Sequence, residues 1–394
     1  MPVNFTGQLN ANEIFSAIYN MIISQQVFAD NINDTKSTLV DEARVDGSLY
    51  GDTKLYYATD VLKSVEWGAD AETANLLQTH RPPSPKCQEI VLDVFRQIAL
   101  TVDDYMTKRA WGTEGAFSEF NGVMRGWIGD TKRVYDSTTY NAFVGTVESS
   151  IGRQNMTVDV TSVVGEATGE AAARLEGGAI AEFIANLLVD LEDVSRDFND
   201  YKYLRSSAIG DLKFIWNSKA VSKIEKRDLP TIYHKEIMDK FAEHTLPARY
   251  FGIPINTTNL ATYSAATPAA GKPINSSTGA YTPGTNNANG TLRARSEQDI
   301  IVSGVTTHVF AGDEIPANTT VTNATIGAGL DIYIEDNTIL FKVIHKRSIP
   351  YMSAFEVGTS FFNPKALNEN NYLTWGHNTL DYLANYPMIT VRKK

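Results

Sequence analysis

One long amphipathic segment limits the folds open to this chain more than any other feature. Between Thr168 and Arg205, apolar residues recur at steps of three and four, which places them on one face of an α-helix. They are Ile180, Phe183, Ile184, Leu187, Leu188, Leu191, Val194 and Phe198. At 1.5 Å per residue such a helix is a rod of about 40 Å, with Gly177 and Gly178 as the expected site of a kink. The segment therefore predicts an elongated molecule with this helix as its spine.

The size and composition predict a folded protein with several lobes. The 394 residues exceed an ordinary domain of about 100 to 200 residues, so we expect two or three lobes. Hydrophobic residues make up 43% of the chain and charged residues 21%, which supplies enough apolar material for packed cores. The N-terminus lacks the pattern of a signal peptide, and the single Cys87 has no partner for an intramolecular disulfide. We therefore expect the protein to be made and kept in a reducing cytosol.

The net charge limits the classes of partner. At a net charge of -11, the chain lacks the dense Lys and Arg surface that sequence-independent binding to nucleic acid phosphates requires. An acidic protein can still enclose DNA, because the wall of a container need not adhere to its contents.

The first half of the chain combines amphipathic and extended segments. Residues 12–32 have helical spacing and read either as an ordinary core helix or as an arm that packs on a neighbouring subunit. Residues 40–85 are polar and irregular, and they predict an extended excursion. A strand should run through residues 97–102, followed by a short helix capped by Asp103 and Asp104. Between about 112 and 165, recurring glycines and aromatic residues predict short elements.

The second half predicts an α/β lobe with an insertion. A buried strand begins near Leu212, and a helix should begin at Pro230, which is tolerated in a first turn. From about 254 to 327 the composition shifts to Asn, Thr, Ser, Ala and Gly, which predicts an exposed region of loops or β-structure. Residues 331–346 alternate as two strands of a hairpin, and a short helix from about Thr379 should precede a final strand.

No residue pattern in the sequence indicates catalysis or cofactor binding. The six histidines are scattered, without metal-ligand spacing, and no nucleophile elbow, phosphate loop or dinucleotide fingerprint is present. Cys87 has only Lys86 nearby to lower its pKa, so a plain cysteine is the favoured interpretation. The acidic pairs Asp103-Asp104 and Glu192-Asp193 read as caps or solvated side chains. We therefore predict no catalytic, cofactor-binding or metal-binding residues, no cofactor and no enzyme activity.

Four stretches, taken in order, carry a resemblance to a known family. They are QIALTVDDYMTKRAW, the helix from Ala179 to Arg205, LKFIWNSKAVSKIEKRDLPTIYHKEIMDKF and GHNTLDYLANYPMITVR. In this order they resemble the returning strand of an extended loop, the spine helix, the axial lobe and the terminal helix and strand of the major capsid proteins of tailed double-stranded DNA bacteriophages. The resemblance covers nearly the whole chain, but its motifs are not invariant signatures.

The resemblance implies an α+β protein with the Hong Kong 97-type capsid fold. The segments it implies are an N-terminal arm (1–39), an extended loop (40–111), a peripheral domain with the spine helix (112–206), an axial domain (207–350) with an insertion at about 254–327, and a C-terminal return to the peripheral domain (351–394).

The resemblance also implies a structural role. It predicts self-assembly into hexamers and pentamers of an icosahedral virion shell around double-stranded DNA, assembled in the host cytoplasm. The implied partners are a scaffolding protein, a portal protein at one vertex and decoration proteins, with no membrane. The family's Lys-Asn cross-link cannot be placed on this chain. The alternatives are the shell protein of an encapsulin-like nanocompartment and a phage tail or baseplate protein.

Overall fold

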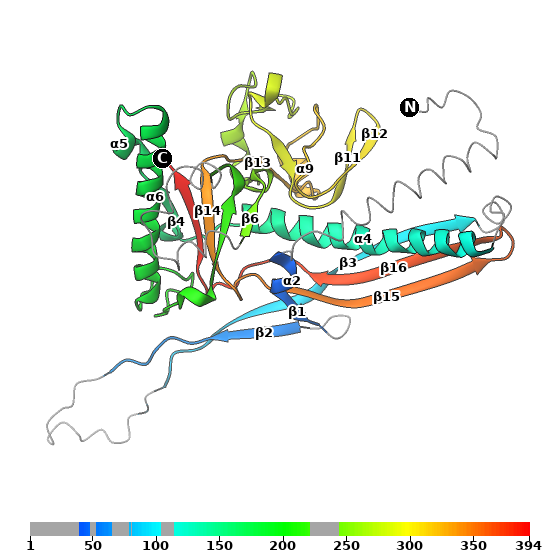
Figure 1. Cartoon of the computed structure of the whole chain (residues 1–394), viewed down its shortest axis with the longest axis horizontal. Coiled ribbons are helices and arrows are strands. Elements are labelled where there is room, and N and C mark those ends of the chain that lie inside the picture. The colour runs from blue at the N-terminus through cyan, green and yellow to red at the C-terminus, as the bar shows by residue number, and fades with distance from the viewer. Residues whose placement is uncertain (1–38, 48–52, 65–78, 80, 104–113, 221–243) are drawn as a thin grey trace. The chain divides into compact units, whose positions relative to one another are not determined.

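The chain forms two compact units, each assembled from segments that are distant in the sequence. The computed structural model describes residues 39–47, 53–64, 79, 81–103, 114–220 and 244–394 (Figure 1). The first unit comprises Met1–Asp52, Val91–Thr138 and Tyr351–Thr379, and the second comprises Thr53–Ile90, Thr139–Pro350 and Leu380–Lys394. The five segments implied by the resemblance divide the chain differently, and their boundaries and roles remain predictions.

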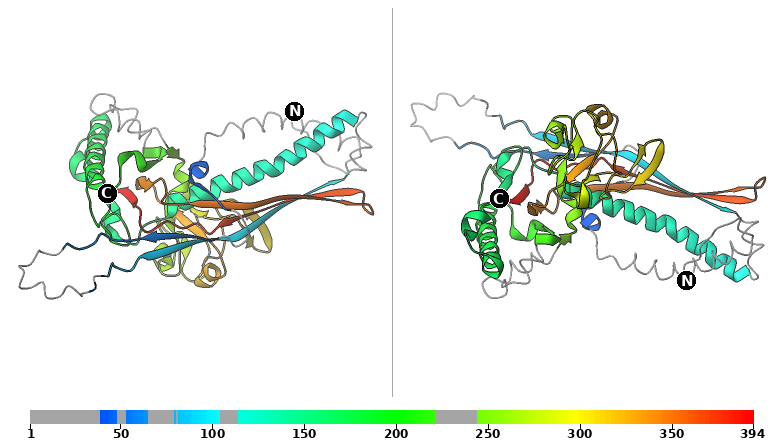
Figure 2. Two further views of the ribbon diagram at one scale, coloured as in Figure 1. Left: turned by 90° about the horizontal axis from the view of Figure 1, so that it is seen from below. Right: turned by 90° about the horizontal axis from the view of Figure 1, so that it is seen from above.

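Long antiparallel strands form most of the first unit. Its elements are α2 (Leu39–Ala43), β1 (Arg44–Asp46), β3 (Lys86–Asp103, in this unit from Val91), β15 (Tyr351–Asn363) and β16 (Asn368–Asn378). β16 pairs with β15 on one side and with β3 on the other, and the three strands run side by side in both views of Figure 2. β1 pairs in parallel with the start of β15 only, from Tyr351 to Ser353. The predicted strand through residues 97–102 is confirmed as part of β3.

A single helix of 33 residues, α4 (Glu114–Thr146), replaces the short elements predicted after residue 112, and that prediction is wrong. At 1.5 Å per residue it is about 50 Å long. Gly126 and Gly129 do not interrupt it. Glycine lowers helix propensity, but burial of aromatic residues such as Tyr135, Tyr140 and Phe143 outweighs this local preference.

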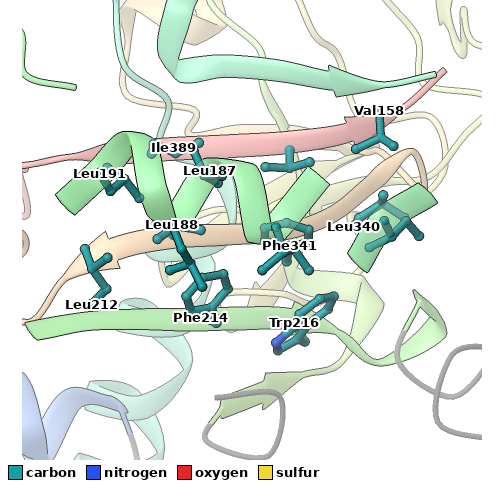
Figure 3. Packing of buried hydrophobic residues seen from close by; sticks show 14 of the residues in the cluster. Val158, Leu187, Leu188, Leu191, Leu212, Phe214, Trp216, Leu340, Phe341 and Ile389 are labelled. Carbon is teal, nitrogen blue, oxygen red and sulfur yellow. The ribbon is translucent and has the colours of Figure 1, made fainter. Parts of the chain in front are cut away.

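A mixed five-stranded sheet forms the core of the second unit, in the order β4-β17-β14-β5-β6. Its strands are β4 (Asn155–Val158), β5 (Leu212–Asn217), β6 (His244–Leu246), β14 (Ile339–His345) and β17 (Met388–Lys393). Leu187, Leu188 and Leu191 of α6 (Gly169–Glu192) pack on Phe214 and Phe341 of this sheet (Figure 3). Short helices η2 (Gly152–Gln154), α5 (Val160–Val164) and η3 (Ile209–Asp211) lie before and after α6 in the sequence. The predicted buried strand near Leu212 is confirmed as β5.

The predicted amphipathic helix is confirmed, but it ends thirteen residues before Arg205. It continues through Gly177 and Gly178 and stops at Glu192. Beyond it, Ser195 and Arg205 form a β-bridge. The turn between them contains Lys202 at a left-handed φ of 55° and is closed by the Asn199 side chain, which bonds to the backbone N–H and C=O of Tyr203. These side-chain to backbone bonds compete with helix continuation and explain the early end.

The segment at 254–327 is more ordered than its composition predicted, because it forms part of a second hydrophobic core. Ile274, Tyr281, Leu292 and Ile332 are among the fully buried members of this core. The apolar residues occur singly among Asn, Thr and Gly, so no periodic pattern reveals them. The segment and its flanks contain η5 (Ala248–Tyr250), β7 (Gly252–Pro254), η6 (Leu260–Tyr263), β8 (Ser264–Ala265), β9 (Ile274–Asn275), η7 (Thr285–Asn287), β10 (Leu292–Ala294), β11 (Gln298–Val302), β12 (Val305–Val309), α9 (Asn323–Gly327) and β13 (Ile332–Glu335).

The hairpin predicted at residues 331–346 does not form, although both of its strands exist. β13 pairs with β10 and β7, whereas β14 pairs with β17 and β5 in the other sheet. Asp336 accepts hydrogen bonds from the backbone N–H and hydroxyl of Thr338, and this turn leads the chain from one sheet to the other. Both strands are buried along nearly their whole length, as expected for strands within a core.

The helix predicted from Thr379 is also absent, and the chain between β16 and β17 is irregular. Thr379 donates from its backbone and its hydroxyl to Asp93, and Ala384 accepts from the backbone of Asp200. The final strand is confirmed as β17. The amphipathic segment at 12–32, the helix after Asp103 and the helix from Pro230 lie outside the described residues. Among the described helices, none is long and apolar enough to cross a membrane.

Candidate functional surfaces and buried polar centres

The residues that could carry chemistry do not gather into a metal site. His244, His308, His345 and His377 lie on different strands, and His80 and His234 lie outside the described residues. In the described part of the chain, no group of three or more His, Cys, Asp or Glu residues could hold a metal ion.

Cys87 and the two acidic pairs are likewise dispersed. Cys87 is exposed near the start of β3, beside Lys86, whose ammonium lies 4.8 Å from the centroid of the Tyr201 ring. Of the acidic pairs, Glu192-Asp193 ends α6, where Asp193 accepts from the next backbone N–H, and Asp104 lies outside the described residues. The prediction that the chain has no catalytic, cofactor-binding or metal-binding residues stays a prediction.

The base of the extended loop is fixed to the turn that follows α6. β2 (Thr53–Ala58) leads to Asp60, which accepts hydrogen bonds from Arg196 at 2.7 Å and from the backbone of Leu204 at 3.1 Å. The hydrogen bond from Arg196, followed by those from backbone N–H groups, lowers the pKa of Asp60 to about 2. Arg205 donates to the carbonyl of Thr59 at 2.6 Å. The loop therefore has a rigid base within the second unit.

Apolar side chains are exposed beside this rigid base. Leu55 and Tyr57 project from the same face of β2, and Val61 and Leu62 follow it. The exposed fractions of Tyr57 and Leu62 are 66% and 72%. Several large apolar groups that are close in sequence and exposed to this degree are typical of a surface that another macromolecule covers.

The end of the β15–β16 hairpin forms a second apolar surface. All residues from Glu356 to Asn363 are exposed. Phe361 and Phe362 have exposed fractions of 63% and 54%, and because they are adjacent in a strand they project from opposite faces. Val357 and Leu367 are also exposed. Sequence reasoning missed this surface, although an aromatic pair directly before Asn363-Pro364 was a readable signal of an exposed turn.

A third exposed surface lies at the tip of the β11–β12 ribbon. Ser303 and Gly304 form its turn at left-handed φ values of 52° and 82°. Ile301 and Val305 on either side of the turn are exposed. At the other end of the ribbon, His308 contacts Asp299 at 2.7 Å. The ribbon thus presents an apolar tip from a polar stem.

A buried polar centre in the first unit joins α4 to the sheet. Asp136 of α4 accepts from the hydroxyl of Tyr351 at 2.6 Å and from Arg44 at 3.2 Å. Burial, followed by the charge of Asp136, raises the pKa of Tyr351. Lys132, one turn earlier, pairs with Glu356 at 2.7 Å. These bonds satisfy a carboxylate whose burial would otherwise be costly.

His377 is a neutral histidine in the same unit. Its Nδ1 lies 2.8 Å from the carbonyl of Asn378, which can only accept, so Nδ1 carries the proton. Nε2 then accepts from the hydroxyl of Tyr135 at 2.7 Å. Burial lowers the pKa of His377 below its ordinary value. The imidazole therefore orients the β16 strand against α4 without carrying charge.

A second buried carboxylate lies in the second unit. Asp200 accepts from Ser149 at 2.6 Å, from Gln154 at 2.8 Å and from the hydroxyl of Tyr382. Burial and the hydrogen bond to Asp200 raise the pKa of Tyr382 to about 12. Gln154 also accepts from the backbone of Met388 at 2.8 Å. This network holds the C-terminal segment in place, and it is satisfied as a structural centre should be.

Lys342 is the most deeply buried ionisable group, with no exposed surface. It lies on β14, the central strand of the sheet, and its amine donates to the carbonyl of Val147 at 2.5 Å. Burial lowers the pKa of Lys342 to about 7. The sequence signal was a lysine inside the apolar run Ile339–Ile344, and we did not single it out.

The comparisons with known proteins give a fold. No protein-family model matches the chain. No curated protein matches it either. It is similar to a chain of the capsid structure of Staphylococcus phage Andhra, with a TM-score of 0.54, 9% identity and coverage of 91% of this chain and 87% of the other. It is also similar to a chain of the structure of the head fiber and inner core protein gp22 of native bacteriophage P68, with a TM-score of 0.56, 10% identity and coverage of 90% and 84%.

The predicted fold class is confirmed by this likeness. The protein is a mixed α and β chain with the Hong Kong 97-like fold. At about 10% identity the likeness shows the fold alone, because one fold can serve many functions.

Proposed function

We propose that this chain is a structural protein that self-assembles into the icosahedral capsid shell of a tailed bacteriophage. Its location would be the virion, and it would enclose double-stranded DNA without acting as an enzyme. The single observation that carries the proposal is the likeness in fold to the Andhra capsid chain, because it spans 91% of this chain and 87% of the other. A fold that accounts for both chains over nearly their full length leaves little room for a separate catalytic domain.

The exposed apolar surfaces support a protein that binds copies of itself. Tyr57 and Leu62 beside the extended loop, the pair Phe361 and Phe362, and Ile301 on the ribbon are at separate places in the chain. One apolar surface serves a dimer, whereas several unlike surfaces permit heterologous contacts that close into rings. Hexamers and pentamers are the rings that an icosahedral shell requires.

The charge of the chain defines the proposed relation to DNA. With a net charge of -11, the inner surface would contact packaged DNA without sequence preference and with low affinity. A scaffolding protein during assembly, a portal protein at one vertex and decoration proteins are the further proposed partners. They follow from the proposed shell.

Size-exclusion chromatography of the full chain, expressed alone and together with a scaffolding protein, tests the proposal. We expect elution as capsomers or as particles in at least one of the two conditions. A stable monomer in both conditions would overturn the proposal.

A further inference from the structure

The last turn of α4 is clamped within the second unit from several sides. The position of a Cβ on Gly145 would lie 2.1 Å from the carbonyl oxygen of Tyr250, so the helix contacts the η5 backbone directly. Arg295 donates to the hydroxyl of Thr146 at 2.9 Å. The amine of Lys342 donates to the carbonyl of Val147, which directly follows the helix. Lys342 therefore bonds to the end of the helix, where carbonyl groups lack partners within the helix.

The charged groups around Lys342 balance only when its amine is neutral. Glu148, Asp336, Arg295 and Arg392 are the groups whose charges act on it. Arg392 pairs with Glu148 and lies 3.4 Å from Asp336, which joins the β17 strand to the ends of α4 and β13. Two carboxylates then face two guanidinium groups. An additional positive charge on Lys342 would leave the cluster with an excess of one.

The hydrogen bonding of Lys342 also favours the neutral amine. Val147 provides the one acceptor that the described residues offer to its nitrogen, whereas an ammonium group has three protons to donate. Directly across the sheet, the buried hydroxyl of Thr390 has no hydrogen-bond partner within the described residues. A protonated Lys342 would therefore hold two unsatisfied donors in a site closed to water, which is unfavourable.

We propose that Lys342, with Glu148, Asp336, Arg295 and Arg392, forms a proton-sensitive latch on the last turn of α4. The neutral amine keeps the latch closed. Uptake of a proton places an ammonium group against Arg295 and Arg392, and the turn loses its contacts with Lys342 and η5. The latch belongs to the second unit alone and does not depend on the proposed capsid function.

Hydrogen exchange of the full chain, measured by mass spectrometry, tests the latch. We compare protection of residues 142–148 at about pH 6 and about pH 8.5, on either side of the Lys342 pKa of about 7, after correction for the intrinsic exchange rate. In the wild type we expect protection to fall at least about tenfold at the lower pH. In Lys342→Met we expect equal protection at both values. The matched control Lys346→Met removes an exposed lysine near the end of the same strand, and it should keep the wild-type response.

A second variant keeps the proposal testable if Lys342→Met does not fold. Glu148 raises the pKa of Lys342, so Glu148→Gln should move the midpoint of the wild-type protection change to lower pH. Equal protection of the wild type at both pH values would overturn the latch. So would an unchanged pH response in Lys342→Met, or an unmoved midpoint in Glu148→Gln.

Discussion

Replacing Lys342 with methionine should make the second unit more stable at neutral pH. The buried amine has a pKa of about 7 in the folded chain, against an ordinary value of 10.5. At 1.36 kcal/mol for each pH unit, keeping this group buried costs the folded state about 4 kcal/mol at neutral pH. Methionine has a similar shape and no charge. It loses the bond to Val147, whose unsatisfied carbonyl costs about 1 to 3 kcal/mol. The expected net gain is about 2 kcal/mol.

The direction of the pH dependence distinguishes this cause from better packing. The unfolded chain holds the Lys342 proton up to about pH 10.5, whereas the folded chain releases it near pH 7. Wild-type stability therefore rises between these values, and the cost of burial shrinks to about 1 kcal/mol near pH 10. Below about pH 7 both states bind the proton and the cost is constant. The advantage of Lys342→Met should thus be full at neutral pH and absent or reversed near pH 10.

Urea unfolding of both proteins at about pH 7 and about pH 10 measures this difference. The slope of free energy against urea concentration should be the same for both, so the midpoints report stability. A variant that is less stable than the wild type at neutral pH would refute the reasoning. A gain of the same size at both pH values would also refute it, because better packing does not titrate.

Three further predictions concern other parts of the chain. Changing Phe361 and Phe362 to serine should alter the free energy of unfolding by less than about 1 kcal/mol, because both rings are exposed, yet should abolish assembly as measured by sedimentation; normal particles would contradict this. Because the pKa of His377 is lowered, the unfolded chain binds its proton first, and stability should fall as the pH drops below about 6.5; His377→Gln should reduce this loss in urea titrations at successive pH values, and an unchanged loss would count against the neutral imidazole. Gly145→Ala should destabilise by about 1 to 3 kcal/mol in thermal unfolding through its clash with η5, whereas Gly126→Ala, with open space around it, should be neutral or stabilising; equal effects would exclude the close contact.

The elements that the sequence predicted best are those with a strong local pattern. The apolar stripe of α6, the alternation in β3 and the apolar run of β5 each gave the correct element type. Local patterns also misled where tertiary contacts decide. The turn at Asp336 resembles that of a hairpin, but the two strands belong to different sheets. The end of α6 depends on the turn closed by Asn199, which periodicity cannot show.

The functional surfaces were harder to predict than the fold. Exposure of Phe361 depends on β15 lying at the edge of its sheet beyond Ser353, and this follows from the pairing of strands rather than from sequence. The same is true of Lys342, whose acceptor, Val147, is distant in the sequence. Apolar spacing in the insertion was too sparse to predict a core around Tyr281. Such features arise from long-range contacts, which local propensity does not encode.

Cryo-electron microscopy of the sedimentable fraction of the expressed protein tests the central claim most directly. We predict closed icosahedral particles, built from rings of this chain, in which Phe361, Phe362 and Leu62 are buried between copies. Particles that bury other surfaces and leave these side chains in solvent would contradict the proposed contacts. Absence of any closed assembly, with and without a scaffolding protein, would contradict the capsid function itself.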